Sequence, residues 1–310
     1  MKSMGTILTT MLPARTVIPM KPRCNWMTVV IATLFLSDLS LPAQDKPAAP
    51  VSESDEAKLS REQLQVSLEQ VAPLRLQHAE TGAEIERVAH PVLRFAAPLW
   101  GNHHGTVWVW GKRGRPVAVL EMCQQKDNGV WAQAFHATTD TPIKLPMPNG
   151  KTWVPKSSNL KFQPLSNAPR PADTPTARLR QMKALAQKFS AHQLWTWREG
   201  DGSRHELRLL TTPVHRYEDR DQQLIDGAIF VIAQGTNPEA TLFLEAIHPA
   251  NEAQPIWQFG IGRTSFAEQI VNYEDQEVYH DPPVKHAEIF NSTNSYWRTT
   301  ATLPEKASQP

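Results

Sequence analysis

The segment PVLRFAAPLWGNHHGTVWVWGKRGRPVAVLEM, residues 91–122, can be laid without a gap over PVHRYEDRDQQLIDGAIFVIAQGTNPEATLFL, residues 213–244. The offset is 213 − 91 = 122, and eight of the 32 pairs are identical, Arg94 with Arg216 among them. Several other pairs keep the size and polarity of the side chain. Such self-similarity is typical of one supersecondary unit that is used twice.

The repeat continues on both sides of this segment. Downstream, Trp131 falls on Trp257 at an offset of 257 − 131 = 126, so the second copy has four extra residues in the preceding loop. Upstream, apolar positions at helical spacing predict a helix ahead of each copy, one capped by Ser60 and one by Thr174. Alternating apolar positions between turn residues predict about five antiparallel strands after each helix. The predicted fold class is α+β, in two tandem copies of one helix followed by an antiparallel meander, a layout shared by analogy with cystatin-like and NTF2-like folds.

The first 43 residues are typical of an export signal. Lys21 and Arg23 precede an apolar run at residues 27–36, and small residues that could be cleaved follow it. We expect translation to start at Met20, because the residues before it add nothing that a signal needs. The run is short for a membrane span, so we predict cleavage, no stable membrane span afterwards, and a periplasmic or extracellular protein. An uncleaved membrane anchor is the alternative.

The composition of the remaining sequence predicts where ordered and disordered segments begin and end. Polar residues without an aromatic side chain predict a disordered tether, and a polar stretch rich in proline predicts a linker between the copies. We expect the last strand to be an edge strand near residues 287–302. The predicted parts are a signal peptide at 1–43, a disordered tether at 44–57, a first α+β repeat at 58–155, a linker at 156–173, a second α+β repeat at 174–302 and a disordered tail at 303–310.

Five short segments of the second copy are similar to a known family: ARLRQM from residue 177, ELRLL from 206, PVHRY from 213, DGAIFV from 226 and GTNPE from 235. Together they resemble a family of exported, planctomycete-type bacterial proteins of unknown function. The resemblance covers most of the chain after the tether. It implies export and implies that both copies belong to one protein, but it implies no catalytic residue.

Charge and motifs narrow the classes of partner. The formal net charge is +1 and no cluster of lysine and arginine stands out, so we predict no nucleic-acid partner. The sequence contains no nucleophile elbow, phosphate loop, dinucleotide fingerprint or paired-cysteine motif, so we predict no cofactor. The partner is left open, with a protein and a carbohydrate as the two candidates. Trp108 and Trp110 could stack on a sugar, but we expect them in the core, and we expect Cys123 to be a buried, inert thiol.

The places where the two copies disagree are the catalytic candidates. His136 falls on Gly262 and Asp226 on His104, while His215 has no histidine counterpart. One hypothesis is a small-molecule enzyme with a pocket between helix and sheet, in which His136 or His215 works as acid or base with the Asp226 carboxylate. The alternative is that these side chains are satisfied inside strands. The segment from residue 102 to residue 105 is expected to be a solvated loop.

Arg94 and Arg216 are the one charged pair retained in both copies. Each is flanked by apolar residues, and an arginine on a core strand needs a carboxylate or several carbonyl groups. A structural ion pair is the first interpretation, and recognition of an anion at the junction of the copies is the second.

Residues near the C-terminus supply the densest set of metal-ligand types. His280, Asp281 and His286 surround a Pro282-Pro283 turn, but their spacing matches no established metal motif, so we predict no metal site there. Taken together, the sequence predicts an exported protein that binds or scaffolds without catalysis, through the groove between its two units. Whether the chain is an enzyme is left open.

Overall fold

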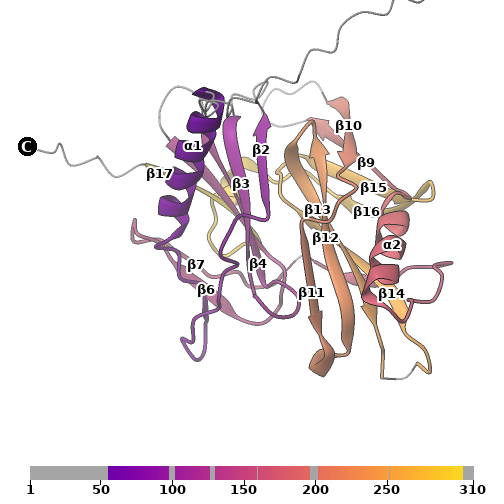
Figure 1. Ribbon diagram of the computed structural model, residues 1–310. Helices are drawn as coiled ribbons and strands as arrows, with labels where there is room; N and C mark the ends of the chain where they lie inside the picture. The colour runs from indigo at the N-terminus through magenta and orange to yellow at the C-terminus, as the bar shows by residue number, and fades with distance from the viewer. Residues whose placement is uncertain are drawn as a thin grey trace, which may run out of the picture. The chain divides into compact units, whose positions relative to one another are not determined.

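The structure is a computed structural model that describes residues 55–97, 102–125, 130–158, 160–195, 202–250 and 252–302 (Figure 1). The predicted signal peptide, most of the tether and the predicted tail lie outside the described residues. Within them, antiparallel sheets dominate and helices are few, which confirms the α+β prediction.

The first part of the chain builds one helix and eight strands: α1 (Asp55–Val71), β1 (Gln77–His78), β2 (Leu93–Ala97), β3 (Asn102–Trp110), β4 (Ala118–Gln125), β5 (Val130–Ala137), β6 (Ile143–Pro146), β7 (Thr152–Trp153) and β8 (Phe162–Pro164). The second part follows with α2 (Pro175–Ala186), β9 (Phe189–Trp195), β10 (Ser203–Leu209), β11 (His215–Asp219), the short 3-10 turn η2 (Arg220–Gln222), β12 (Leu224–Gln234), β13 (Asn237–Ile247), β14 (Ile256–Arg263), β15 (Glu268–Tyr273), β16 (Gln276–Asp281), α3 (His286–Ile289) and β17 (Tyr296–Thr302). One sheet has the strand order β17-β5-β4-β3-β2, and a second has the order β16-β15-β9-β10-β12-β13-β14-β8 with β11 also on β12. A third, small sheet has the order β1-β6-β7.

Matching strands of the two parts pair in matching register. Phe95 of β2 is opposite Gly105 of β3, and 122 residues later Tyr217 of β11 is opposite Gly227 of β12. In both pairs the aromatic ring lies across the glycine: a Cβ would lie 2.2 Å from a ring atom of Phe95 and 2.4 Å from one of Tyr217. Glycine is therefore required at both positions by the same close contact.

The change of offset is also visible in the pairing. Leu120 of β4 is opposite Phe135 of β5, and Leu242 of β13 is opposite Ile261 of β14. The first members differ by 242 − 120 = 122 and the second by 261 − 135 = 126. The four extra residues of the second part thus fall between β13 and β14, and the strand register is unaffected.

Each helix covers the outer face of one sheet. Alternate residues of a strand point to opposite faces, and the even-numbered residues of the central strands point toward the helix. The core under α1 contains Val71, Trp108, Trp110, Leu120 and Met122. The core under α2 contains Met182, Phe230, Ile232, Leu242 and Leu244.

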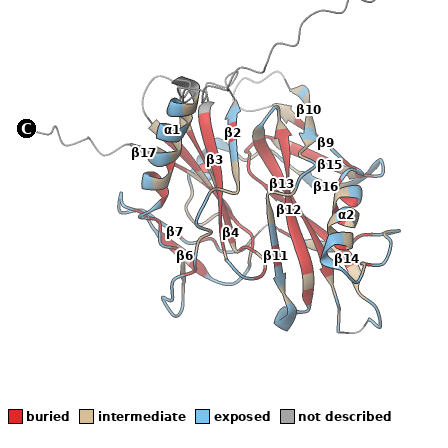
Figure 2. Ribbon diagram, viewed as in Figure 1, coloured by how far each residue is buried: buried red, intermediate tan, exposed pale blue. Residues whose placement is uncertain are grey.

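The odd-numbered residues of the same strands form a further core between the two sheets. Val107 and Val119 from the first sheet belong to one apolar cluster with Ile229 and Phe243 from the second. Figure 2 shows that the central strands are buried along most of their length. The sequence predicts a groove between the two units. In this region the space is instead filled with apolar side chains.

Several boundaries differ from the sequence expectation. α1 begins at Asp55, so the end of the predicted tether is helical and Ser60 lies inside the helix rather than at its cap. β8 lies in the predicted linker and pairs with β14. β17 pairs with β5, so the last strand of the predicted second repeat joins the first sheet. The cap of α2 is as predicted, since the Thr174 hydroxyl accepts a hydrogen bond from the backbone of Ala177.

Candidate functional site

Arg94 and Arg216 are both used to hold a strand to its helix. Arg94 of β2 donates to the backbone oxygen of Ser60 at 2.8 Å and to its hydroxyl at 2.5 Å. Arg216 of β11 donates to the Asp226 carboxylate at 2.6 and 2.9 Å and, at 3.4 Å, to the backbone oxygen of Pro175 at the start of α2. These contacts favour the structural interpretation of the retained arginine pair.

Asp226 lies between two guanidinium groups. Arg178 of α2 donates a hydrogen bond to the Asp226 carboxylate at 2.9 Å. Arg216, on the neighbouring strand β11, approaches the same carboxylate to 2.6 Å. The side chains of Arg178 and Asp226 are 5% and 6% exposed, so the charges are buried and neutralised within the protein. Both carboxylate oxygens are occupied, which leaves Asp226 poorly suited to accept a proton from a substrate.

His136 and His215 do not meet a carboxylate. Both ring nitrogens of His136 and Nε2 of His215 are buried without a hydrogen-bond partner in the described part of the chain. Burial lowers the pKa of both rings, for His136 to about 3, with the positive charge of Arg263 as a second cause there. A paired histidine and carboxylate, which the enzyme hypothesis requires, is not formed by these candidates.

His136 instead marks the place where the two sheets touch. Its ring lies against Gly262, where an added Cβ would be only 2.2 Å from Cε1. Gly262 is also the residue that corresponds to His136 at the offset of 126. The absence of a side chain in one copy therefore makes room for the ring in the other.

The metal candidates find separate partners. His280 lies 2.9 Å from Glu268, whereas the Asp281 carboxylate accepts hydrogen bonds from Arg263 at 2.6 Å and from the Tyr279 hydroxyl at 2.9 Å. His286 packs against the ring of Phe290 on α3. Among the described residues, no group of three His, Cys, Asp or Glu side chains is placed to hold a metal ion.

Four further residues can be compared with expectation. Trp108 and Trp110 are buried in the core, as predicted. Cys123 is 4% exposed, which confirms that the thiol is buried, and burial raises its pKa to about 12. The solvated loop predicted around His104 was wrong: this histidine lies in β3, is buried, and has its pKa lowered to about 4 mainly by burial.

Arg115, just ahead of β4, makes the principal polar link between the units. Its Nε and Nη2 atoms donate to the two carboxylate oxygens of Glu245 on β13 at 2.7 and 2.6 Å. The Tyr217 hydroxyl and the Gln258 side chain donate to the same carboxylate at 2.8 and 2.7 Å. The guanidinium also lies 3.9 Å from the centre of the Phe162 ring. Glu245 is fully buried, so this bidentate pair fixes the position of Arg115.

A groove of about 580 Å³ opens beside this link. Residues of both units line it, and basic side chains predominate over acidic ones. The polar lining residues that bear on its chemistry are His78, Arg113, Arg115, Asp219, His248 and Gln258.

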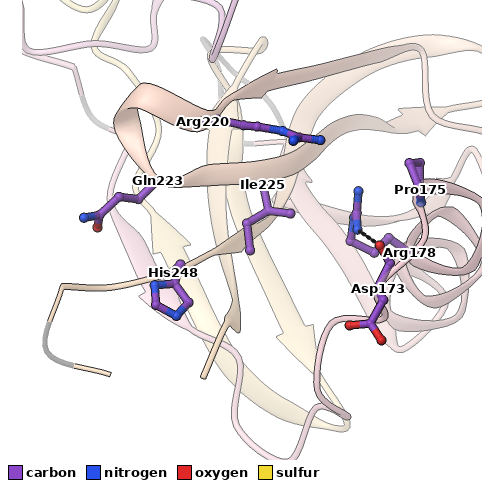
Figure 3. A pocket seen from close by; sticks show the side chains of 7 residues that line it. All are labelled: Asp173, Pro175, Arg178, Arg220, Gln223, Ile225 and His248. Carbon is purple, nitrogen blue, oxygen red and sulfur yellow. Dashed lines mark hydrogen bonds between the residues drawn. The ribbon is translucent and has the colours of Figure 1, made fainter. Parts of the chain in front are cut away.

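A second groove, of about 440 Å³, adjoins the first and shares Gln223 and His248 with it (Figure 3). Arg220 extends over this groove from η2, and Ile225 lies in its middle. Arg178 is held at its far side by a hydrogen bond to the backbone of Asp173 at 2.9 Å. We call the two grooves together the junction groove.

Sequence reasoning missed the residues of the junction groove. Arg115 and Glu245 are 130 positions apart and stand at non-equivalent places in the repeat, so no local pattern connects them. One signal was present: at the offset of 122, Glu245 falls on Cys123, and burying a charged carboxylate in a core strand is costly unless a cation pairs with it.

No known protein family, curated protein or solved structure matches this chain. None of the helices in the described part of the chain has the length and apolar character that a membrane crossing requires.

Proposed function

We propose that this chain is an exported, non-catalytic binding protein, and that the junction groove takes a small ligand or peptide segment that carries an anionic group, such as a carboxylate or a phosphate. The observation that carries this proposal is the lining of the groove: Arg113, Arg115, Arg220 and two histidines against the carboxylates of Asp173 and Asp219. Arginine suits this task because its planar donors match the oxygens of carboxylate and phosphate groups.

The fixed position of Arg115 supports binding rather than catalysis. Its Nε and Nη2 atoms donate to Glu245 and its guanidinium lies on Phe162, so a ligand would meet the remaining donor, Nη1, in a position that is already ordered. Ordering a side chain before binding lowers the entropy cost of the complex. Arg113 and His248 also line the groove and are exposed, so their side chains are accessible to a ligand.

We also infer that the two units arose by duplication, in a layout of helix and meander comparable with cystatin-like and NTF2-like folds. The matching registers at offsets of 122 and 126 support this inference. Export and membership of the planctomycete-type family are part of the same proposal and rest on the N-terminal and repeat sequences.

The proposal is tested by titrating the purified chain with inorganic phosphate, sulfate and malonate at low ionic strength, followed by calorimetry. We expect saturable binding of at least one of these anions. Replacing both exposed basic residues, in the double variant Arg113→Gln/His248→Gln, should weaken it about tenfold or more, because each charged hydrogen bond contributes roughly 1.5–3 kcal/mol.

Arg170→Gln is the matched control, since Arg170 is exposed and lies outside the junction groove. Anion affinity that falls equally in the control would show that only overall charge matters. Native mass spectrometry of the protein from its own host adds an independent check, because a ligand retained by the wild type should be lost from the double variant.

A further inference from the structure

The two sheets face each other with their central strands running in opposite directions. Arg115, ahead of β4, binds Glu245 near the end of β13. Six residues further along β4 stands Glu121, and six residues back along β13 stands Glu239. Between these positions the ring of His136, which pairs with Val119, lies against Gly262, which pairs with Thr241. β4 and β13 therefore run antiparallel across the interface, and the same spacing places Glu121 near Glu239, whose charge acts on it.

Glu121 belongs to the inner face of its sheet. It stands between Val119 and Cys123, which are members of the core between the sheets, and alternate residues of a strand share a face. Glu239 lies at a bulge of β13, where Ala240 pairs with Ile232 and Pro238 with Ala233, and it is 5% exposed. Glu121 is half-buried, and the charge of Glu239 acts on it, so the two side chains are neighbours.

Neither carboxyl group has the neutralising partner that Glu245 has. Oε2 of Glu121 is buried and has no hydrogen-bond partner in the described residues. Glu239 is 5% exposed and accepts a hydrogen bond from Asn237 at 2.9 Å. At the offset of 122, Asn237 corresponds to Arg115. Glu239 therefore has an amide beside it, whereas Glu245, at the other end of the interface, is paired with a guanidinium.

The remaining titratable and charged groups around the pair come from four strands. They are Cys123 on β4, His136 on β5, Tyr296 and Arg298 on β17, and Arg263 on β14, which is itself paired with Asp281. Arg298 is the one cation whose charge acts on Glu121, and its guanidinium lies 5.5 Å from the centre of the Phe266 ring. Among the residues that the structure describes, no salt bridge joins an arginine to either glutamate.

We propose that Glu121 and Glu239 form a buried proton-binding site that couples the closure of the two sheets to pH. With both carboxyl groups protonated, neither glutamate places a negative charge between the sheets. When Glu239 releases its proton to solvent, a carboxylate is left between the sheets with only neutral hydrogen-bond donors, and the contact of β4 with β13 weakens. This inference is independent of the junction groove.

The electrostatics of the pair agree with this arrangement. Burial raises the pKa of Glu239 from 4.5 to about 7, against the opposing effect of hydrogen bonds from Asn237 and Ser265. Burial and the charge of Glu239 raise the pKa of Glu121 well above its usual value, while Arg298 lowers it. Glu239 is therefore the group that changes charge near neutral pH.

The test is urea unfolding of the full chain between pH 5 and pH 8, for the wild type, Glu239→Gln and the exposed control Glu252→Gln. The folded state binds the extra proton between the unfolded pKa near 4.5 and the folded pKa near 7, so stability is greatest below this window and falls as pH rises through it. Relative to Glu239→Gln, the unfolding equilibrium constant of the wild type should rise about 70-fold from pH 5 to pH 8. The control should follow the wild type. Parallel pH profiles for the wild type and Glu239→Gln would overturn the proposal.

A second measurement on the wild type does not depend on any variant. Cys123 lies two residues from Glu121 and is buried in the same interface, so alkylation of its thiol reports opening. Iodoacetamide labelling is read at the peptide that contains Cys123 and divided by the rate for the urea-unfolded chain at the same pH. We expect protection to fall by a factor of ten or more between pH 5 and pH 8. Protection that stays constant over this range would also overturn the proposal.

Discussion

The link between Arg115 and Glu245 allows the sharpest test of how the units are held together. Replacing Arg115 by methionine keeps an unbranched apolar side chain but removes the guanidinium, and with it both the pairing with Glu245 and the contact with the Phe162 ring. Glu245 is then left fully buried with Tyr217 and Gln258 as its remaining partners. Breaking a buried ion pair on one side costs roughly 3–5 kcal/mol, because the uncompensated charge remains in the interior.

We expect a loss near the lower limit, about 3 kcal/mol. The reason is that Arg115 is 36% exposed, so solvent already screens part of the attraction. For a folded region of this size, about 3 kcal/mol corresponds to a decrease in Tm of roughly 6–12 °C.

The assay is a double-mutant cycle with Glu245→Gln, measured by urea unfolding at pH 7. Glu245→Gln removes the charge that Arg115 neutralises while keeping the hydrogen-bond acceptor, so the double variant should recover about 2 kcal/mol relative to the sum of the single changes. Arg113→Met is the control, because Arg113 is its exposed neighbour, and it should cost less than about 0.5 kcal/mol. Equal stability of the Arg115 and Arg113 variants, or strict additivity in the cycle, would refute the reasoning.

Two other contacts give predictions that stability measurements can check. Gly262→Ala places a Cβ 2.2 Å from the His136 ring and should cost about 1–3 kcal/mol by overpacking. Adding His136→Ala to this variant should relieve the clash, so the two changes should be less than additive in thermal unfolding. A Gly262→Ala variant as stable as the wild type would contradict the contact. Asp226→Asn leaves the buried Arg178 without a neutralising charge and should cost about 3 kcal/mol in urea unfolding, whereas Arg216→Met should cost less because Arg216 is 35% exposed. The reverse order of these two effects would argue against Asp226 as the centre of the network.

The repeat in the sequence was sufficient to predict an antiparallel meander, because the register of a hairpin is a local consequence of alternation and turn length. It did not predict the pairings between distant strands, such as β9 with β15 or β17 with β5. The offset of 122 for Phe95 and Tyr217, and the change to 126 before β14, both reappear in the paired residues. The boundaries were less accurate. α1 begins ahead of Ser60, since a capping residue can also be accommodated within a helix when a tertiary contact, here from Arg94, satisfies it.

The candidate site could not be predicted in the same way. Its residues come from turns and strand ends that are far apart in the chain, and only the packing of one sheet on the other brings them together. His104 illustrates the difficulty: beside another histidine and before a glycine it reads as a loop, yet it occupies a strand position at which the second copy has Asp226. The expectation that function would be found where the copies differ led to His136, which proved to be a packing contact with Gly262.

The differences between the copies nevertheless have a physical meaning at the interface. If two identical units packed face to face with antiparallel central strands, the contact of Arg115 with Glu245 would occur twice, once at each end. It occurs once, because Cys123 and Asn237 stand at the positions that correspond to Glu245 and Arg115.

One end of the interface therefore has a buried carboxylate that is neutralised by Arg115, beside an open basic groove. The other end has two carboxyl groups without a bridging cation. An asymmetry of this kind gains nothing in packing, since apolar residues would fill both ends better. It is consistent with two ends that serve different tasks, binding of an anion at one and of a proton at the other, and the variants at Arg113, His248 and Glu239 test the two ends separately.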